Sequence, residues 1–214
     1  MERSSPPPFH VERILQDAEG AGIPLLPDSA AKLVGYGALL GDRAGPLGLV
    51  SEADSDRLYE RHVLDSLRAA ALIPQRGVLV LDLGSGAGLP GMVLAIAQPG
   101  NAFTLAEPKT RAAGFLELAV DRLELGNVTV AVARAQELHT EVDVVTARAF
   151  GPIHRSWGAA VRLLRPGGFL VYFAGGRFSI GTARSLTVPE RPGRVDMATV
   201  LENAPPLVMM SRTG

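Results

Sequence analysis

The sequence contains no cysteine, and its four histidines are scattered along 214 residues. Without thiolates, neither a disulfide framework nor a cysteine-based zinc site can form. The histidines stand at positions 10, 62, 139 and 154, with none of the short spacings that bring metal ligands together. These absences predict a protein without a bound metal.

Long apolar runs and an excess of one charge are also missing. No apolar stretch approaches the roughly 18 residues that a membrane-spanning helix needs. The N-terminal run Met1-Glu-Arg-Ser-Ser-Pro-Pro-Pro8 lacks the apolar core of a secretion signal. A formal net charge of −1 does not by itself indicate a nucleic-acid binder. We therefore expect a cytoplasmic protein that does not enter a membrane.

The order of hydrophobic patterns predicts the fold class. Amphipathic patterns over residues 11–21, 29–40 and 54–72 predict helices, which we assign to an N-terminal helical extension of residues 1–76 packing on the core. In the core, residues 77–214, the pattern predicts strands at 77–82, 102–106, 127–132, 142–147 and 168–173 and helices at 89–98, 109–124 and 153–164. From about residue 174 the signal decays, and strands are placed only near 184–188 and 206–211. The alternation predicts an α/β fold with a doubly wound, mostly parallel sheet.

The most informative segment is Asp82-Leu-Gly-Ser-Gly-Ala-Gly-Leu-Pro-Gly91. It follows an apolar run and precedes a helix-like one, so it reads as a turn between a strand and a helix. Gly84, Gly86 and Gly88 allow the backbone to turn tightly and to approach a ligand closely. The segment predicts a site for a nucleotide-like cofactor. The alternative is a structural turn whose glycines only permit packing.

Two cofactor classes fit such a turn. Gly86, Gly88 and Gly91 match the dinucleotide pattern G-x-G-x-x-G, so a nicotinamide-dependent oxidoreductase is one alternative. In that class a pyrophosphate rests on the helix N-terminus, where the carboxylate of Asp82 would repel it. A carboxylate at the strand end instead suits a cationic group such as the amino group of S-adenosylmethionine. We therefore predict a methyltransferase with Asp82 and the alternating glycines among its cofactor contacts.

A second acid supports this prediction. The next predicted strand ends in Glu107, 19 residues after Gly88. One βαβ step supplies a separation of about 20 residues between the turn and the acid that binds a ribose. We predict that Glu107 accepts hydrogen bonds from the ribose hydroxyls of the cofactor. The alternative is an ordinary acid favoured at the start of the following helix.

Five motifs together carry a family resemblance. They are Arg61-His62-Val-Leu-Asp65-Ser66-Leu67, the glycine run from Leu81 to Gly91, Lys109-Thr-Arg111 with Phe115-Leu116, Arg134-Ala135-Gln136-Glu137, and Asp143-Val-Val-Thr-Ala-Arg148-Ala149. With them the chain resembles the RsmG (GidB) family of bacterial 16S ribosomal RNA methyltransferases, which modify N7 of a guanine. The resemblance spans residues 30 to 175. It implies a Rossmann-like, class I S-adenosylmethionine-dependent methyltransferase, a monomer whose partner is 16S ribosomal RNA or the 30S subunit.

The resemblance also implies roles for individual residues. Cofactor contacts transfer to Gly84, Leu89, Glu107, Ala135, Gln136 and Arg148. Residues 134–137 follow the third strand, where a backbone N–H and a side chain can meet the adenine edge. A plain loop is the alternative there. Arg148 ends the fourth strand and can hold the methionine carboxylate, guanine O6 or a surface ion pair.

N7 of guanine has an in-plane lone pair and no proton, so no general base is required. We therefore expect no certain catalytic residue and predict a guanine pocket instead. His62, Asp65 and Ser66 are spaced three and four apart, which places them on one helix face, and with Arg148 they are the candidates for positioning the substrate. A structural pair of His62 with Asp65 is the alternative.

The sequence departs from the family pattern in two places. Ala174-Gly175 stands where most members have Lys-Gly, and Gly48-Leu-Val50 replaces the usual Asn-Leu-Thr. With a charge near neutrality, the missing lysine leaves open a related methyltransferase acting on a small molecule. Steep salt dependence of RNA binding would argue against that alternative.

Overall fold

The computed structural model describes residues 10–51, 57–175, 178, 193–198, 200 and 204–213. All structural statements below concern these residues. The strand predicted near 184–188 lies outside them.

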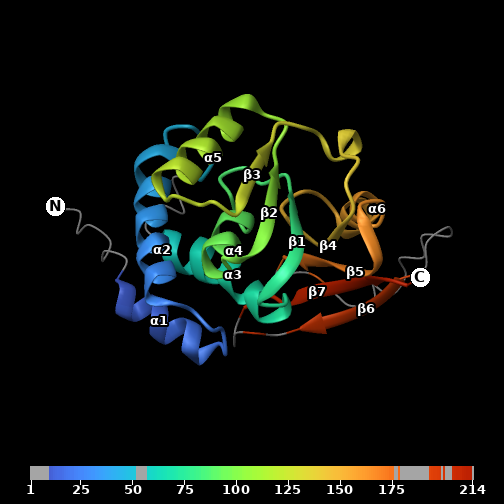
Figure 1. Ribbon diagram of the computed structural model, residues 1–214, viewed down its shortest axis with the longest axis horizontal. Coiled ribbons are helices and arrows are strands. Elements are labelled where there is room, and N and C mark those ends of the chain that lie inside the picture. Colours follow the sequence, from blue (N-terminus) through green and yellow to red (C-terminus); the bar gives the residue numbers. More distant parts are fainter. Residues whose placement is uncertain are drawn as a thin grey trace.

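Among the described residues, seven strands form one sheet in the order β3-β2-β1-β4-β5-β7-β6 (Figure 1). The strands are β1 (Arg76–Leu83), β2 (Gly100–Ala106), β3 (Val128–Ala131), β4 (Val142–Arg148), β5 (Leu164–Phe173), β6 (Gly193–Ala198) and β7 (Leu207–Arg212). The first five pair in parallel, whereas β7 is antiparallel to both β5 and β6. The order reverses between β1 and β4, so the carboxyl ends of these two strands mark the switch point. The predicted doubly wound α/β fold is confirmed.

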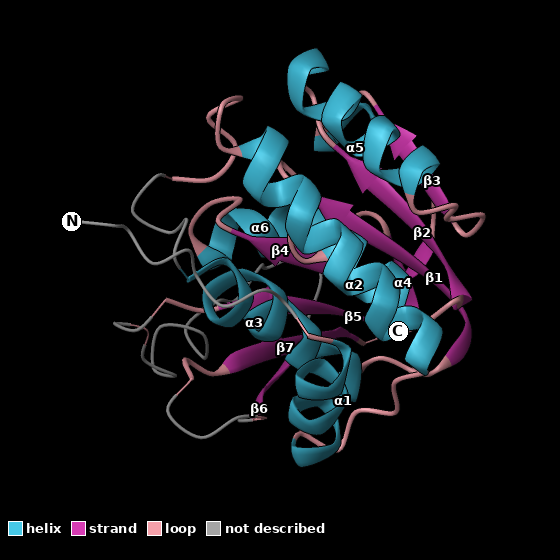
Figure 2. Ribbon diagram, turned by 90° about the vertical axis from the view of Figure 1, so that its left-hand side faces the viewer, coloured by secondary structure: helices cyan, strands magenta, loops and turns pink. Residues whose placement is uncertain are grey.

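Helices cover the two faces of the sheet unequally. On one face α4 (Gly91–Ala97) and α5 (Thr110–Arg122) make the crossovers between β1, β2 and β3. The N-terminal helices α1 (Val11–Gly20) and α2 (Pro27–Leu39) lie on the same side, with a π-helical turn η1 (Leu40–Ala44) after α2 (Figure 2). The other face carries α6 (Ile153–Ala160), the crossover from β4 to β5. A short 3₁₀ turn, η5 (Ala135–Glu137), precedes β4.

Each face has its own hydrophobic cluster. Alternating residues of one strand divide between them: Val80 of β1 joins Leu33 of α2 and Leu116 of α5, whereas Leu81 joins Trp157 of α6. This alternation is the period of two that a strand imposes on its side chains. Because the N-terminal helices share a cluster with α4 and α5, they pack directly on the α/β part of the chain. The division at residues 76 and 77 stays a prediction.

The prediction of one regular α-helix over residues 54–72 is wrong. Its described part consists of a π-helical stretch η3 (Tyr59–Leu64), one α-helical turn α3 (Asp65–Leu67) and a 3₁₀ stretch η4 (Arg68–Leu72). Apolar spacing determines which side of a helical segment faces the core. It does not determine whether each N–H bonds three, four or five residues back, so the pattern could not reveal the change.

The region from α6 to the C-terminus also differs from prediction. α6 ends at Ala160 rather than 164, and β5 begins at Leu164 rather than 168. Residues 165–168 form an irregularity within the sheet, because Val142 pairs with Leu164 but Val144 pairs with Phe169. The strand predicted at 206–211 is confirmed as β7, and β6 was not predicted.

Candidate functional site

The glycine run forms a tight turn at the carboxyl end of β1. Gly84, Gly86 and Gly88 have φ angles of +68°, +54° and +89°. The N–H groups of Gly84 and Ser85 both donate to the carbonyl of Ala106 at the end of β2, over 2.9 and 3.1 Å. These bonds fix the turn between the two strands. Left-handed conformations explain why glycine stands at the three alternate positions.

The three glycines differ in what surrounds them. A Cβ on Gly84 would lie 2.9 Å from the ring of Phe150, and one on Gly88 would lie 2.8 Å from both Met92 Cβ and the Tyr36 hydroxyl. At Gly86 the nearest atom would be the Gly84 carbonyl, 3.9 Å away. Gly84 and Gly88 therefore serve the protein's own packing, and Gly86 is the position where the backbone is open to a ligand.

Asp82 lies beneath the turn and is fully buried. One carboxylate oxygen accepts the Gly91 N–H over 3.2 Å, and the other accepts the Thr146 hydroxyl over 2.6 Å. Burial raises the pKa of Asp82, while its hydrogen bonds and the nearby Arg148 act in the opposite direction. The carboxylate of Asp82 thus connects β1 to the start of α4 and to β4. The spacing of residues in the sequence did not reveal this structural role.

Glu107 lies beside the open glycine. Its two carboxylate oxygens accept the N–H groups of Gly86 and Lys109, over 3.0 and 2.9 Å. Each oxygen has a second lone pair, so the carboxylate can still accept hydrogen bonds from two hydroxyls. Glu107 is 6% exposed, so only a small part of the residue is accessible. Leu89 continues the same turn, with its N–H donating to the Ser85 carbonyl over 3.1 Å.

Ala135 and Gln136 reach the site through Phe150. They belong to η5, which is stabilised by the Glu137 carboxylate accepting the Arg134 N–H over 2.7 Å. Both line a cavity of about 160 Å³ that Phe150 also lines. Because Phe150 packs against Gly84, this cavity is adjacent to the glycine turn.

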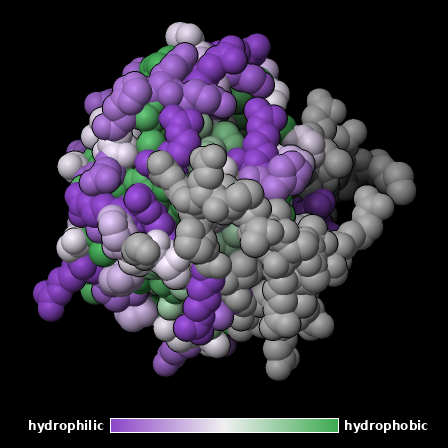
Figure 3. Space-filling model, turned by 90° about the vertical axis from the view of Figure 1, so that its right-hand side faces the viewer, coloured by the Kyte–Doolittle hydropathy of each residue, from purple (hydrophilic) through white to green (hydrophobic). Residues whose placement is uncertain are grey.

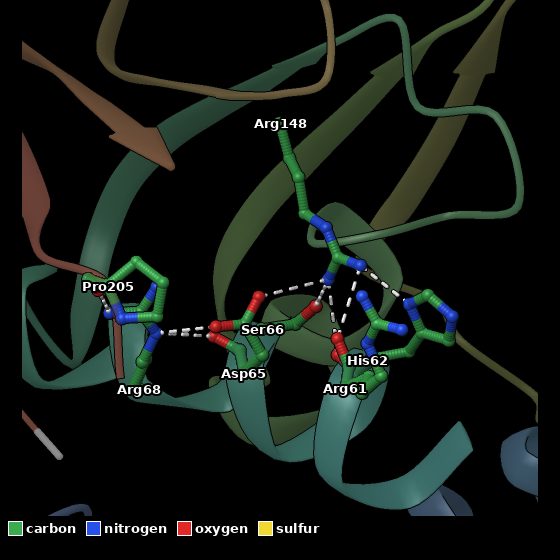
Figure 4. A network of polar contacts seen from close by, with 7 residues as sticks. All are labelled: Arg61, His62, Asp65, Ser66, Arg68, Arg148 and Pro205. Carbon is green, nitrogen blue, oxygen red and sulfur yellow. Dashed lines mark hydrogen bonds and ion pairs between the residues drawn. The ribbon is translucent and has the colours of Figure 1, made fainter. Parts of the chain in front are cut away.

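Arg148 points toward the helical stretch that precedes the sheet (Figure 4). Its guanidinium lies 2.6 Å from His62 Nδ1 and 3.4 Å from the Asp65 carboxylate, and it donates to the Ser66 hydroxyl over 3.1 Å. It also donates to the backbone carbonyls of Arg61 and His62. Burial lowers the pKa of Arg148, and Asp65 counteracts that shift. The four predicted substrate-positioning residues are therefore brought together.

Sequence analysis missed Arg68, which belongs to the same network. Its side chain is 1% exposed and donates to the Asp65 carboxylate over 2.9 Å, so Asp65 bridges two arginines. Arg68 also donates to the Pro205 carbonyl and lies over the Phe173 ring. No local pattern distinguishes such an arginine from an exposed one, because its partners come from distant segments.

Tyr36 and Ala149 were also missed. The Tyr36 hydroxyl, contributed by α2, donates to the Ala87 carbonyl inside the glycine turn, and burial raises its pKa. Ala149 follows Arg148 with a φ of +53°, a conformation that residues with a Cβ rarely adopt. It separates Arg148, which contacts the η3 and α3 segments, from Phe150, which packs on the α6 cluster.

The glycine turn and Glu107 fit the predicted cofactor. An open glycine with positive φ, flanked by a carboxylate with free lone pairs at the next strand end, suits an adenosine ribose at the switch point. A doubly wound sheet with this turn and this acid defines a class I S-adenosylmethionine-dependent methyltransferase. Within that class, a family model described as "GidB: rRNA small subunit methyltransferase G" matches residues 29–183. The chain belongs to the GidB family.

Individual relatives agree with this assignment. The chain is 42% identical over 169 residues to "Ribosomal RNA small subunit methyltransferase G" of Thermobifida fusca, covering 77% of this chain and 71% of that protein. A protein of the same name from Clavibacter michiganensis is 45% identical over 142 residues, 65% of this chain and 66% of the relative.

Solved structures share the fold at low sequence identity. One is M. jannaschii TYW2 in complex with AdoMet, with a TM-score of 0.57, 14% identity and coverage of 72% of this chain and 75% of that one. Another is a precorrin-6y C5,15-methyltransferase from Geobacter metallireducens, with a TM-score of 0.53, 16% identity and coverage of 73% and 90%. These likenesses concern the fold alone.

Among the described residues, no three His, Asp or Glu side chains form a group that could hold a metal ion. The helices of the same residues are all too short or too polar to cross a bilayer.

Proposed function

We propose that this protein transfers a methyl group from S-adenosylmethionine to N7 of a guanine in 16S ribosomal RNA. The observation that carries the proposal is the open Gly86 beside Glu107 at the switch point, in a chain of the GidB family. The substrate is proposed to be the RNA within the 30S subunit. The enzyme is proposed to act there as a cytoplasmic monomer.

The cofactor is proposed to lie across the glycine turn. Glu107 binds the ribose hydroxyls, and the backbone of Gly84, Gly86, Gly88 and Leu89 shapes the surface under the adenosyl group. Ala135 and Gln136, in η5, meet the adenine edge. Asp82, fully buried, contributes its charge from beneath the turn toward the methionine amino group. S-adenosylmethionine, when bound, supplies an electrophilic methyl group on a sulfonium.

The guanine is proposed to lie on the Arg148 side of the turn. Arg148 is held by His62, Asp65 and Ser66, so its guanidinium is fixed in direction. Its two NH2 groups contact these partners and the Arg61 carbonyl, so the Nε–H is the donor proposed for guanine O6, next to N7. N7 needs no deprotonation, so the side chains have to position the base within about 3 to 3.5 Å of the methyl group, in line with the breaking bond. Because positioning the base is sufficient, no side chain is proposed as a general base.

The test is transfer of labelled methyl to 30S subunits purified from cells that lack this gene, followed by mapping of the modified base. The wild-type protein should label one guanine at N7. Arg148→Ala should reduce the rate about 100-fold, since a charged hydrogen bond of about 1.5–3 kcal/mol is lost and the base is no longer oriented. Arg165→Ala is the matched control, because Arg165 is paired with Asp143 at the other end of β4.

Other outcomes would assign a different function. Labelling of small molecules but not of 30S subunits would point to the small-molecule alternative. Thermal stabilisation by NAD and none by S-adenosylhomocysteine would overturn the cofactor assignment.

A further inference from the structure

The chain from β4 to the end of β5 carries an unusual charge distribution. Its residues 144–175, all of them described, contain four arginines and no aspartate or glutamate, although the whole chain has a net charge of −1. A charge average over longer segments conceals this run. Clustered arginine on one face is the electrostatic footprint of a nucleic-acid contact.

Two arginines of this run stand apart from the others. Arg148 is paired with Asp65 and Arg165 with Asp143. By contrast Arg155 and Arg162 are exposed, and within the described ranges no carboxylate forms an ion pair with either. Their charges are therefore available to an external anion.

Arg155 and Arg162 line the same cavity. Arg155 lies in α6, Arg162 follows two residues after the end of that helix, and Gly158 lies between them on the lining. The cavity also meets Phe150, with the Arg155 guanidinium 5.9 Å from the centre of its ring. Because Phe150 packs on Gly84, this basic surface begins at the cofactor turn and extends along α6.

The size of the cavity restricts its occupant. Its volume of about 160 Å³ is below the roughly 300 Å³ at which pockets for whole small molecules begin. A phosphate group flanked by two guanidinium groups fits that space. Figure 3 shows the molecule from the α6 side, with hydrophilic side chains predominating over the upper part of this face.

We propose that Arg155 and Arg162, on either side of Gly158, bind backbone phosphates of the RNA strand that flanks the target guanine. The proposal rests on the proposed function, since it takes the RNA substrate as the occupant. It assigns the docking of RNA to the face opposite the N-terminal helices. The cofactor would bind independently of this contact.

The test uses the full chain with Arg155→Ala and Arg162→Ala combined. The matched control combines Arg76→Ala with Arg122→Ala, which removes the same amount of positive charge. Both arginines are exposed, Arg76 as the first residue of β1 and Arg122 in the last turn of α5. KM for 30S subunits should rise about 10- to 100-fold in the first double variant, with the Kd for S-adenosylhomocysteine unchanged. The control should resemble the wild type.

The salt dependence of RNA binding distinguishes the loss of phosphate contacts from a change in the shape of the binding surface. For binding to 16S RNA, the slope of log K against log salt should become shallower by about 1.4, since each phosphate contact to a single strand contributes about 0.7. Gly158→Glu provides an independent variant, because a Cβ at Gly158 meets no atom within 4 Å. It should weaken RNA binding, whereas Gly158→Gln should not.

Several results would overturn the docking proposal. These are an unchanged KM and slope in the arginine double variant, equal losses in the control, or weakened binding to 30S subunits with normal binding to naked 16S RNA, which would indicate a protein partner. Failure of the proposed function looks different. The wild type would then bind RNA with a slope that depends on Arg155 and Arg162 but would label no guanine.

Discussion

The two faces of the sheet are closed in different ways. On one face α2, α4, α5 and the stretch from Tyr59 to Leu72 join a large apolar cluster, and a buried arginine network ties that stretch to β4 and to the segment before β7. On the other face α6 closes a smaller cluster around Trp157 and leaves its outer side to Arg155 and Arg162, which form no ion pair with a carboxylate of the described residues. The first face encloses its charges, whereas the second presents them.

The difference begins at the end of β4. Arg148 turns toward the N-terminal helices and Phe150 toward α6, with the positive φ of Ala149 between them. In a regular strand, residues two apart would point to the same face. Arg148 and the proposed docking surface, which begins at Phe150, therefore start two residues apart and serve opposite faces.

The largest effect is expected from removing the main side chain of the α6 cluster. Trp157→Ala should lower the free energy of unfolding by about 3–5 kcal/mol, and Leu33→Ala on the other face by about 2–5 kcal/mol, because both side chains are fully buried. Urea unfolding followed by circular dichroism measures both. Leu26→Ala, at an exposed position, should change it by less than about 0.5 kcal/mol. A Trp157 variant as stable as the wild type would show that α6 contributes little to closing its face.

The second prediction concerns the turn where the two faces meet. Glu107→Ala removes the acceptor of two backbone N–H groups and the proposed ribose ligand. The Kd for S-adenosylhomocysteine should rise about 100-fold, corresponding to roughly 3 kcal/mol, as measured by calorimetry. Glu117→Ala, on the exposed side of α5, is the control. Wild-type affinity in the Glu107 variant would show that the ribose binds elsewhere.

The third prediction concerns Asp82, the buried acid at the end of β1. Burial raises the folded-state pKa of Asp82, so its contribution to stability is fully present below the ordinary value of 3.8 and is lost as the pH rises through the raised value. Asp82→Asn should abolish this loss, because the amide oxygen can accept from Gly91 while the amide nitrogen donates to Thr146. Unfolding measured across acidic to neutral pH should therefore be flatter in the variant. Parallel curves for the two proteins would exclude Asp82 as the origin.

The smallest effect is expected at Ala149. Replacement by glycine removes the cost of positive φ but increases the entropy of the unfolded chain, so the net change should stay within about 0.5 kcal/mol. Ala149→Val should destabilise by about 1–3 kcal/mol, because a β-branched residue tolerates this conformation poorly. Thermal unfolding of the three proteins checks the order. Equal melting temperatures for alanine and valine would show that the backbone at this position is not strained.

Much of the candidate site could be predicted from local sequence. Asp82, the glycines and Glu107 stand at strand ends that periodicity locates, and parallel strands bring those ends to one edge. The spacing of His62, Asp65 and Ser66 also indicated a shared side, and all three contact Arg148. Arg68 and Tyr36 could not be found in this way, since their partners, Pro205 and Ala87, are distant in sequence.

By itself the sequence determined the order of strands and helices from β1 to β5, the glycine turn and the acids beside it, because these depend on side-chain periodicity and on backbone conformations available to few residues. Only the tertiary structure decided which face each charge serves. Burial and pairing of an arginine depend on segments that meet through folding, so Arg68 became enclosed while Arg155 and Arg162 stayed open to an anion.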